Sequence, residues 1–158
     1  MAVGIAVVGA GQWGPHLVRN FSDLPDCRVL WLIDPDPARR EALRPRFHEL
    51  PMSDDIESAL TDPEVTAVVI ATPTVTHHGL ARRALRAGKH VLVEKPITDS
   101  LAGALELCEL ADAGGLTLMV GHVFLFNPAV RAAKGLLESG ELGTVHYISM
   151  RRTNLGPV

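Results

Sequence analysis

The sequence predicts an α/β protein built on a doubly wound parallel sheet. Short apolar runs rich in β-branched residues alternate with helix-forming segments, and only short loops separate them. The apolar runs lack polar alternation, which is typical of strands covered on both faces in a parallel sheet. Strand and helix alternate five times, so we expect right-handed crossovers within one sheet.

The predicted strands are residues 3–8, 28–33, 67–71, 90–93 and 116–120. Helices are predicted at residues 15–21, 37–43, 53–60, 76–87, 99–113 and 128–139. These helical segments carry signals at their ends, such as a proline in the first turn, a serine or aspartate N-cap, or a closing glycine.

The carboxyl-terminal segment has a different pattern. Residues 143–152 are predicted to form one long strand after a helix that ends at Gly140. A strand needs a neighbour for its hydrogen bonds, and this sequence supplies no hairpin partner. We therefore expect a first domain at residues 1–122. Residues 123–158 would then be a linking helix and only the first strand of a truncated second α/β domain.

Composition and charge exclude several classes of protein. The 158 residues are 47% hydrophobic and 21% charged, enough to bury a core, and the net charge is −3. So small a charge gives no reason to expect nucleic acid or membrane as partner. No apolar run has the roughly 18 residues of a membrane span, and the start lacks a secretory signal. We expect a cytoplasmic protein.

No metal site is expected either. Cys27 and Cys108 have neither a metal-ligand spacing nor a disulfide framework. His77 and His78 are adjacent, so on a helix their side chains project about 100° apart. No third ligand is spaced to complete a site with them.

A glycine-rich turn separates the first predicted strand from the first predicted helix. It consists of Gly9, Ala10, Gly11, Gln12, Trp13 and Gly14. Gly9 permits the tight turn, Gly11 lets backbone approach a pyrophosphate, and Gly14 allows close helix–strand packing. Asp34 follows Gly14 by 20 residues, at the end of the second strand, where a carboxylate binds the adenosine ribose. Together these features predict a dinucleotide-binding Rossmann domain rather than a glycine turn without a ligand.

Asp34 also favours NAD over NADP, because its carboxylate would repel the 2′-phosphate of NADP. Arg39, Arg40 and Arg44 follow nearby and would attract that phosphate if they faced it. The sequence favours a solvated basic helix face for these arginines. NAD is therefore the expected cofactor, with NADP as the alternative.

A second turn, with Thr72, Pro73 and Thr74, follows the third long strand at the sheet edge where ligands of such folds collect. The hydroxyls of the two threonines can hydrogen-bond a cofactor, and Pro73 can lie against its ribose or ring. The same residues suit a helix entry, with Thr74 or Thr76 as the N-cap. The two roles are compatible.

The next predicted strand runs directly into Glu94, Lys95 and Pro96. Pro96 favours an extended backbone at Lys95, and the bond between them can be cis. Beside an oxidised nicotinamide, the cationic ring and partial desolvation would disfavour the ammonium form of Lys95 and prepare it for proton transfer. Glu94 would hold the side chain in place. The alternative is a salt bridge at the strand end without chemistry.

These motifs resemble the Gfo/Idh/MocA oxidoreductases, which include glucose–fructose oxidoreductase and inositol dehydrogenase. The resemblance covers nearly the whole chain and includes the glycine turn, residues 71–73 with His77, residues 87–96, and residues 121–128. It implies that Lys95 assists hydride transfer between nicotinamide and a sugar carbon. It further implies cofactor-binding positions at Gly9, Ala10, Gly11, Gln12, Trp13, Gly14, Asp34, Thr72, Pro73, Thr74, His77, Glu94, Lys95, Pro96 and His122.

The segments 13–16, 124–128 and 151–154 look most similar to the branch acting on UDP-N-acetylhexosamine-type sugars. Family members also carry a second, largely antiparallel domain that holds the sugar, mediates assembly into homo-oligomers, and supplies a histidine in an Asp-x-x-x-His segment. No such segment follows Tyr147 here. We therefore expect the chain to be a fragment or truncated product of such an enzyme.

Two functional hypotheses remain open from the sequence. The first is an NAD-dependent sugar or nucleotide-sugar dehydrogenase, of which this chain is the cofactor-binding part. The second is an NAD-binding module or remnant without turnover.

Overall fold

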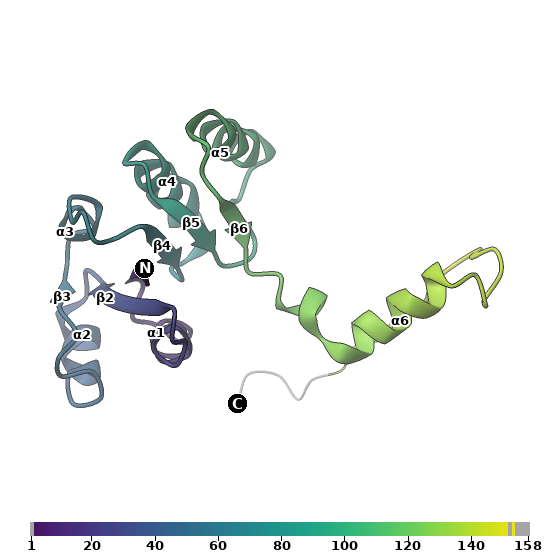
Figure 1. Cartoon of the computed structure of the whole chain (residues 1–158), viewed down its shortest axis with the longest axis horizontal. Coiled ribbons are helices and arrows are strands. Elements are labelled where there is room, and N and C mark those ends of the chain that lie inside the picture. Colours follow the sequence, from purple (N-terminus) through teal and green to yellow (C-terminus); the bar gives the residue numbers. More distant parts are fainter. Residues whose placement is uncertain (1, 152, 154–158) are drawn as a thin grey trace. The chain divides into compact units, whose positions relative to one another are not determined.

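A computed structural model describes residues 2–151 and 153 of the chain. Six parallel strands form one sheet in the order β3-β2-β1-β4-β5-β6, which confirms the predicted doubly wound sheet (Figure 1). The strands are β1 (Val3–Val8), β2 (Cys27–Ile33), β3 (Met52–Ser53), β4 (Ala67–Ile70), β5 (His90–Val93) and β6 (Leu118–Val120). The strand order reverses between β1 and β4, so a crevice is expected at their carboxyl ends.

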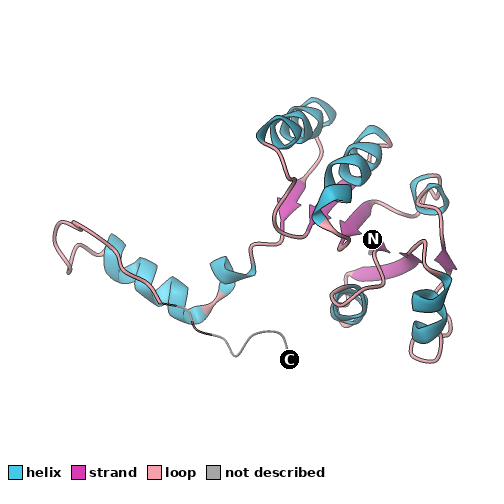
Figure 2. Ribbon diagram, turned by 180° about the vertical axis from the view of Figure 1, so that it is seen from behind, coloured by secondary structure: helices cyan, strands magenta, loops and turns pink. Residues whose placement is uncertain are grey.

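Helices cover both faces of this sheet (Figure 2). They are α1 (Gly14–Ser22), α2 (Pro37–Leu43), α3 (Glu57–Leu60), α4 (Thr74–Arg86) and α5 (Leu101–Gly114). Along β1, Ile5 and Val7 join the core under α1, whereas Ala6 and Val8 join the core under α3, α4 and α5. This alternation follows from the two-residue repeat of a strand. Full burial of a valine or leucine side chain stabilises the fold by about 1.5–3 kcal/mol.

β3 was not predicted, and α3 begins later than the helix predicted in this part of the chain. Residues 53–60 were expected to be helical, but Ser53 ends β3 and α3 begins at Glu57. Pairing with β2 decides the difference, since the Leu32 amide donates to Pro51 O at 3.0 Å and the Asp34 amide donates to Ser53 O at 3.1 Å. The Ser53 hydroxyl accepts from the Asp55 amide in a turn rather than capping a helix.

The chain divides into two compact units, Met1–Gly121 and His122–Val158. The second unit contains a short 3₁₀ helix, η1 (Val123–Phe126), and α6 (Pro128–Glu138). The Asn127 side chain caps α6 by accepting from the Ala129 and Val130 amides, as an N-cap residue does. Its described residues are all exposed. The assignment of this unit to a substrate domain stays a prediction.

The strand predicted at residues 143–152 does not form within residues 143–151, and Arg152 lies outside the described residues. The apolar pattern there is suitable for a strand, but a strand is held by hydrogen bonds to a neighbour, and the described part of the chain provides none. Among the residues that the structure describes, no helix has both the length and the apolar character needed to cross a bilayer.

Candidate functional site

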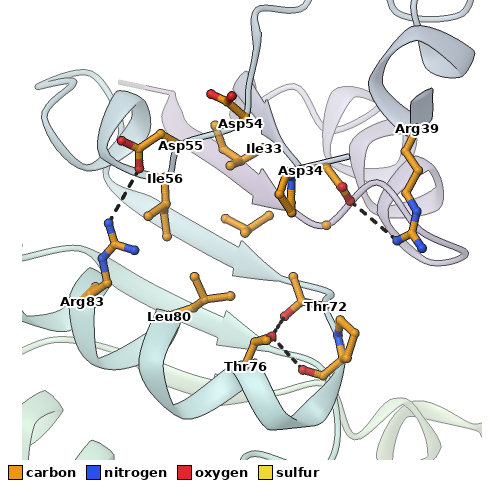
Figure 3. A pocket seen from close by; sticks show the side chains of 14 residues that line it. Ile33, Asp34, Arg39, Asp54, Asp55, Ile56, Thr72, Thr76, Leu80 and Arg83 are labelled. Atoms are coloured by element: carbon orange, nitrogen blue, oxygen red, sulfur yellow. Dashed lines mark hydrogen bonds and ion pairs between the residues drawn. The ribbon is translucent and has the colours of Figure 1, made fainter. Parts of the chain in front are cut away.

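A cavity of about 290 Å³ opens at the carboxyl ends of β1, β2 and β4 (Figure 3). Apolar side chains from three separate segments, Ile33, Ile56 and Leu80, line it. Polar and charged groups stand at its rim. The complete lining is Val8, Gly9, Ile33, Asp34, Pro35, Arg39, Asp54, Asp55, Ile56, Thr72, Pro73, Thr76, Leu80 and Arg83. An apolar cavity with a few convergent polar groups is typical of a small-molecule site.

The glycine turn forms one wall of this site, and its conformation explains two of its glycines. Gly9 has φ of 108°, and a Cβ there would lie 2.5 Å from the Ala71 carbonyl oxygen. A Cβ at Gly14 would overlap the Gly9 carbonyl oxygen. These two positions therefore need glycine for the fold itself, as predicted for the tight turn and for close helix packing.

Gly11 differs from the other two glycines of the turn. The nearest atom that a Cβ at Gly11 would meet is Arg39 Nη1, at 3.7 Å, an ordinary van der Waals distance. The residues of this chain therefore do not require glycine at this position. A glycine here leaves open space beside the backbone, and such space is what a ligand that approaches the main chain needs.

The first turn of α1 can serve an anion. The helix begins at Gly14 after Trp13, whose side chain makes no capping hydrogen bond, and Pro15 occupies the first turn. Pro15 has no N–H and the His16 amide donates to Trp13 O at 3.1 Å, so in this first turn the Gly14 amide is the group left for a negatively charged partner. The Trp13 ring is half exposed and tilts against the His16 ring at a centroid distance of 6.1 Å.

Asp34 connects the end of β2 to the glycine turn. Its Oδ2 accepts from the Ala10 amide at 2.7 Å, and its Oδ1 accepts from the Asp36 amide at 2.9 Å. The residue is only 3% exposed, yet it lines the cavity. A carboxylate has about four acceptor sites, so two stay open for further donors. The predicted juxtaposition of Asp34 with the glycine turn is therefore present.

The three arginines after Asp34 were expected to form a solvated helix face, and the Arg39 and Arg44 side chains are indeed 55% and 46% exposed, but Arg39 also takes part in the site. Arg39 lines the cavity, with Nη1 3.9 Å from Asp34 Oδ2 and Nε 3.4 Å from Asp36 Oδ2. Arg40 donates to the Asp34 carbonyl oxygen, and Arg44 pairs with Glu41 at 3.7 Å. Only Asp34, Pro35 and Asp36 separate β2 from α2, which brings Arg39 in the first turn to the cavity, whereas Arg44 is the C-cap at the other end of this helix.

The turn after β4 brings Thr72 and Pro73 to the opposite wall, and Thr74 begins α4. The Thr76 hydroxyl lies 2.7 Å from both Thr72 Oγ1 and Pro73 O, so the two threonines point toward each other (Figure 3). Pro73 is the N-cap, and it makes no side-chain capping bond. The expected N-cap role of Thr74 or Thr76 was therefore wrong, because the extended backbone of Pro73 sets the helix start.

His77 lies beneath this turn and is 1% exposed. Its Nε2 is 2.9 Å from the Thr72 carbonyl oxygen, and its Nδ1 is 2.8 Å from the Pro96 carbonyl oxygen. Both ring nitrogens are therefore engaged by the protein backbone. The neighbouring His78 points elsewhere, with Nε2 2.8 Å from Glu106 Oε2 on α5.

The Glu94, Lys95 and Pro96 segment follows β5 at the same edge of the sheet, and the Lys95–Pro96 bond is cis. Lys95 is exposed and, within the described residues, makes no ion pair. The expected hold of Glu94 on Lys95 is thus not formed. Instead the Glu94 carboxylate lies over Gly121, where a Cβ would come within 3.3 Å of it.

Lys89 is a buried lysine that the sequence analysis did not single out. It is 9% exposed, and its Nζ donates to the Asp62 and Val65 carbonyl oxygens at 2.9 and 2.6 Å. These bonds tie the start of β5 to the loop before β4. Lys89 therefore stabilises the strand that leads to Lys95, and its ammonium group is used in these two structural hydrogen bonds.

The predicted site residues separate into three groups. Gly9, Asp34, Thr72 and Pro73 surround the cavity, and Ala10 joins them through its bond to Asp34. The Lys95 segment is connected to them through His77. The remaining predictions, including His122 at the start of the second unit, stay predictions.

Sequence reasoning missed the apolar lining of the cavity. Ile33 ends a predicted strand, whereas Ile56 and Leu80 lie on predicted helices, and each of them was recognisable only as a core residue. Arg83 and Asp55, whose side chains approach within 3.7 Å at the rim, carry no local signal either (Figure 3).

A family model and several known proteins match this chain. The model, described as an oxidoreductase family with an NAD-binding Rossmann fold, matches residues 3–122. The scyllo-inositol 2-dehydrogenase (NAD(+)) of Bacillus subtilis is 32% identical over 154 residues, which are 96% of this chain and 45% of the relative. The inositol 2-dehydrogenase of Acidothermus cellulolyticus is 34% identical over 144 residues, 90% of this chain and 42% of the relative.

Among solved structures, GenD2 from gentamicin A biosynthesis, in complex with NAD, has a TM-score of 0.87 and 34% identity. The match covers 92% of this chain and 42% of GenD2. This chain thus spans less than half the length of these relatives.

Proposed function

The chain belongs to the Gfo/Idh/MocA family of oxidoreductases, and from this membership we propose that its crevice binds NAD for hydride transfer to or from a sugar or nucleotide-sugar carbon. The observation that carries the proposal is the bond from the Ala10 amide to the Asp34 carboxylate, beside the cavity between β1 and β4. This bond fixes the acidic ribose-binding group against the turn that would hold the pyrophosphate.

The residues present fit a dinucleotide. Asp34 has acceptor sites left for ribose hydroxyls, and the first turn of α1 has no side-chain cap. The open space beside Gly11 is the second supporting feature, because no atom of this chain requires a glycine there. Ile33, Ile56 and Leu80 offer the apolar surface that a flat purine ring needs.

Lys95 is the proposed proton-transferring residue. Bound NAD supplies the hydride acceptor. As the substrate carbon loses its hydride, Lys95 takes the proton of the hydroxyl on that carbon, so that the alcohol becomes a carbonyl. The exposed side chain, with no ion pair within the described residues, is free to reach a substrate. The inositol 2-dehydrogenases among the relatives support a polyhydroxylated substrate.

Titration of NAD into the 158-residue chain tests the binding step, with calorimetry or the fluorescence of the half-exposed Trp13 as the readout. We expect saturable binding. Absence of binding at millimolar NAD would refute the proposal. NADH absorbance is then followed with UDP-sugars, free sugars and inositols, both for this chain and for a longer protein containing it. NAD binding without NADH formation in either protein would favour the alternative hypothesis of an NAD-binding module without turnover.

The choice of NAD over NADP should depend on Asp34 and Arg39. Two unit charges 4 Å apart interact by about 1–4 kcal/mol between bulk water and a protein surface. Asp34→Asn removes the charge that repels a 2′-phosphate and keeps an acceptor for the Ala10 amide. We expect this substitution to lower the ratio of the NADP dissociation constant to the NAD dissociation constant by about tenfold, equivalent to about 1.4 kcal/mol.

Arg39 would then be the residue that attracts the phosphate, because its guanidinium lies 3.9 Å from Asp34 Oδ2. Adding Arg39→Ala to Asp34→Asn should reverse the gain in NADP affinity. The matched control is Asp112→Asn on the exposed end of α5, which should leave the ratio unchanged. An unchanged ratio in Asp34→Asn would show that Asp34 does not discriminate between the cofactors.

A further inference from the structure

His77 is the residue that physically connects the cofactor turn to the lysine turn. The Thr72 turn follows β4, and the Lys95–Pro96 turn follows β5. The buried His77 ring lies between them, with one nitrogen on the Thr72 carbonyl oxygen at 2.9 Å and the other on the Pro96 carbonyl oxygen at 2.8 Å. The two bonds use opposite sides of one rigid, planar side chain.

Both partners of the ring are carbonyl oxygens, which only accept hydrogen bonds. A neutral imidazole has a single N–H and can donate to one of the two carbonyl oxygens, whereas a protonated ring can donate to both. No apolar side chain can donate to these oxygens, and a part-buried carbonyl that loses its donor is destabilised. Packing alone does not account for a histidine at this position.

We propose that His77 is a positioning residue that fixes the Lys95 turn relative to the Thr72 turn. The proposal rests on the function proposed above, in which NAD lies against the Thr72 turn and Lys95 transfers a proton. Lys95 has no ion pair to Glu94 within the described residues, so the side chain itself is not held by its neighbour. The backbone on its carboxyl side is held through Pro96. Placement of Lys95 beside the cofactor would thus depend on His77, which is 1% exposed and has both ring nitrogens on backbone carbonyl oxygens rather than free for the cofactor contact that the resemblance implied.

The chain offers a direct probe of this placement, because Lys89, Lys95 and Lys134 are its only lysines. Reductive ¹³C-methylation keeps the lysine charge and labels each of them for NMR. Lys95→Arg and Lys134→Arg assign the signals. In the wild-type chain, NAD should shift the Lys95 signal, whereas Lys134, which pairs with Glu138 on the exposed face of α6, should not respond.

The test compares His77→Leu, His77→Gln and the matched control His78→Ala, each with and without NAD. His77→Leu removes both ring nitrogens and with them every hydrogen-bond donor of the side chain. We expect the NAD-induced shift of the Lys95 signal to be lost and NAD affinity to fall by about tenfold. His77→Gln supplies a side-chain amide donor and should restore part of the shift. His78→Ala removes only the contact to Glu106 and should behave like wild type.

The outcomes separate the two proposals. If the wild-type chain binds no NAD, the proposed function fails. If it binds NAD and shifts the Lys95 signal, but His77→Leu does the same with equal affinity, the positioning role is refuted. Should His77→Leu not fold, the Gln variant decides. A folded Gln variant with weaker NAD binding and a reduced Lys95 shift supports the role, and one identical to wild type overturns it.

Discussion

Replacing Lys95 with methionine, in a preparation of this protein that turns over substrate, is expected to lower kcat by about 10²–10⁴-fold, the usual contribution of a positioned acid or base. NAD affinity and thermal stability should change little, because the side chain is exposed and makes no ion pair within the described residues. Steady-state kinetics, NAD titration and thermal unfolding of the same preparation provide the three readouts.

The matched control for this experiment is Lys134→Met. Lys134 is an exposed lysine on α6 that pairs with Glu138 at 3.5 Å and is not among the residues that line the cavity, so its loss changes the charge equally. It should retain wild-type kcat. A wild-type kcat in Lys95→Met would show that Lys95 takes no part in the reaction. An equal loss of kcat in both variants would indicate a general effect of charge.

Gly14→Ala should lower the stability of the fold, whereas Gly11→Ala should weaken NAD binding and leave the stability intact. At Gly14 the new Cβ would overlap the Gly9 carbonyl oxygen, which is backbone and cannot rotate away. Either α1 or the turn must move, and α1 is anchored in the core by the buried Val18. We expect a loss of about 3 kcal/mol or more in the free energy of unfolding, at the upper end for overpacking. Urea unfolding measures it.

At Gly11 the new Cβ meets nothing closer than Arg39 Nη1 at 3.7 Å. Alanine should therefore leave the stability unchanged or raise it by up to about 1 kcal/mol through a less flexible unfolded chain. The methyl group would nevertheless occupy the space proposed for the pyrophosphate, so NAD affinity should fall by at least about tenfold, or about 1.4 kcal/mol. Undiminished NAD affinity in a stable Gly11→Ala variant would mean that the phosphates bind elsewhere.

The comparison of the three glycines illustrates how far the motif could be understood from sequence. Their spacing predicted a tight turn, a ligand approach and a helix contact. The structure separates these roles physically, because a Cβ at Gly9 or Gly14 would meet a backbone oxygen atom, whereas a Cβ at Gly11 would meet only Arg39 Nη1, at an ordinary van der Waals distance of 3.7 Å. Asp34 was likewise placed correctly from its position after the second strand, and its bond to Ala10 confirms that the two motifs meet.

The errors arose where a neighbour far away in sequence decides the structure. Ser53 looked like a helix cap, but a two-residue strand formed there because β2 offered hydrogen bonds. Residues 143–151 looked like a strand and found no partner among the described residues. In both cases the local pattern was compatible with more than one state, and the available hydrogen-bonding partner selected between them.

By itself, the sequence determined the alternation of strands and helices. It also determined which polar side chains follow the carboxyl ends of the strands, where ligands of such sheets are expected. These follow from periodicity and from local backbone preferences, which act over a few residues. Only the tertiary structure decided that Arg39 faces the cavity, that Ile56 and Leu80 line it, and that His77 connects two turns. Such arrangements depend on the packing of segments that are distant along the chain. A local sequence pattern does not encode which distant segment a side chain will contact.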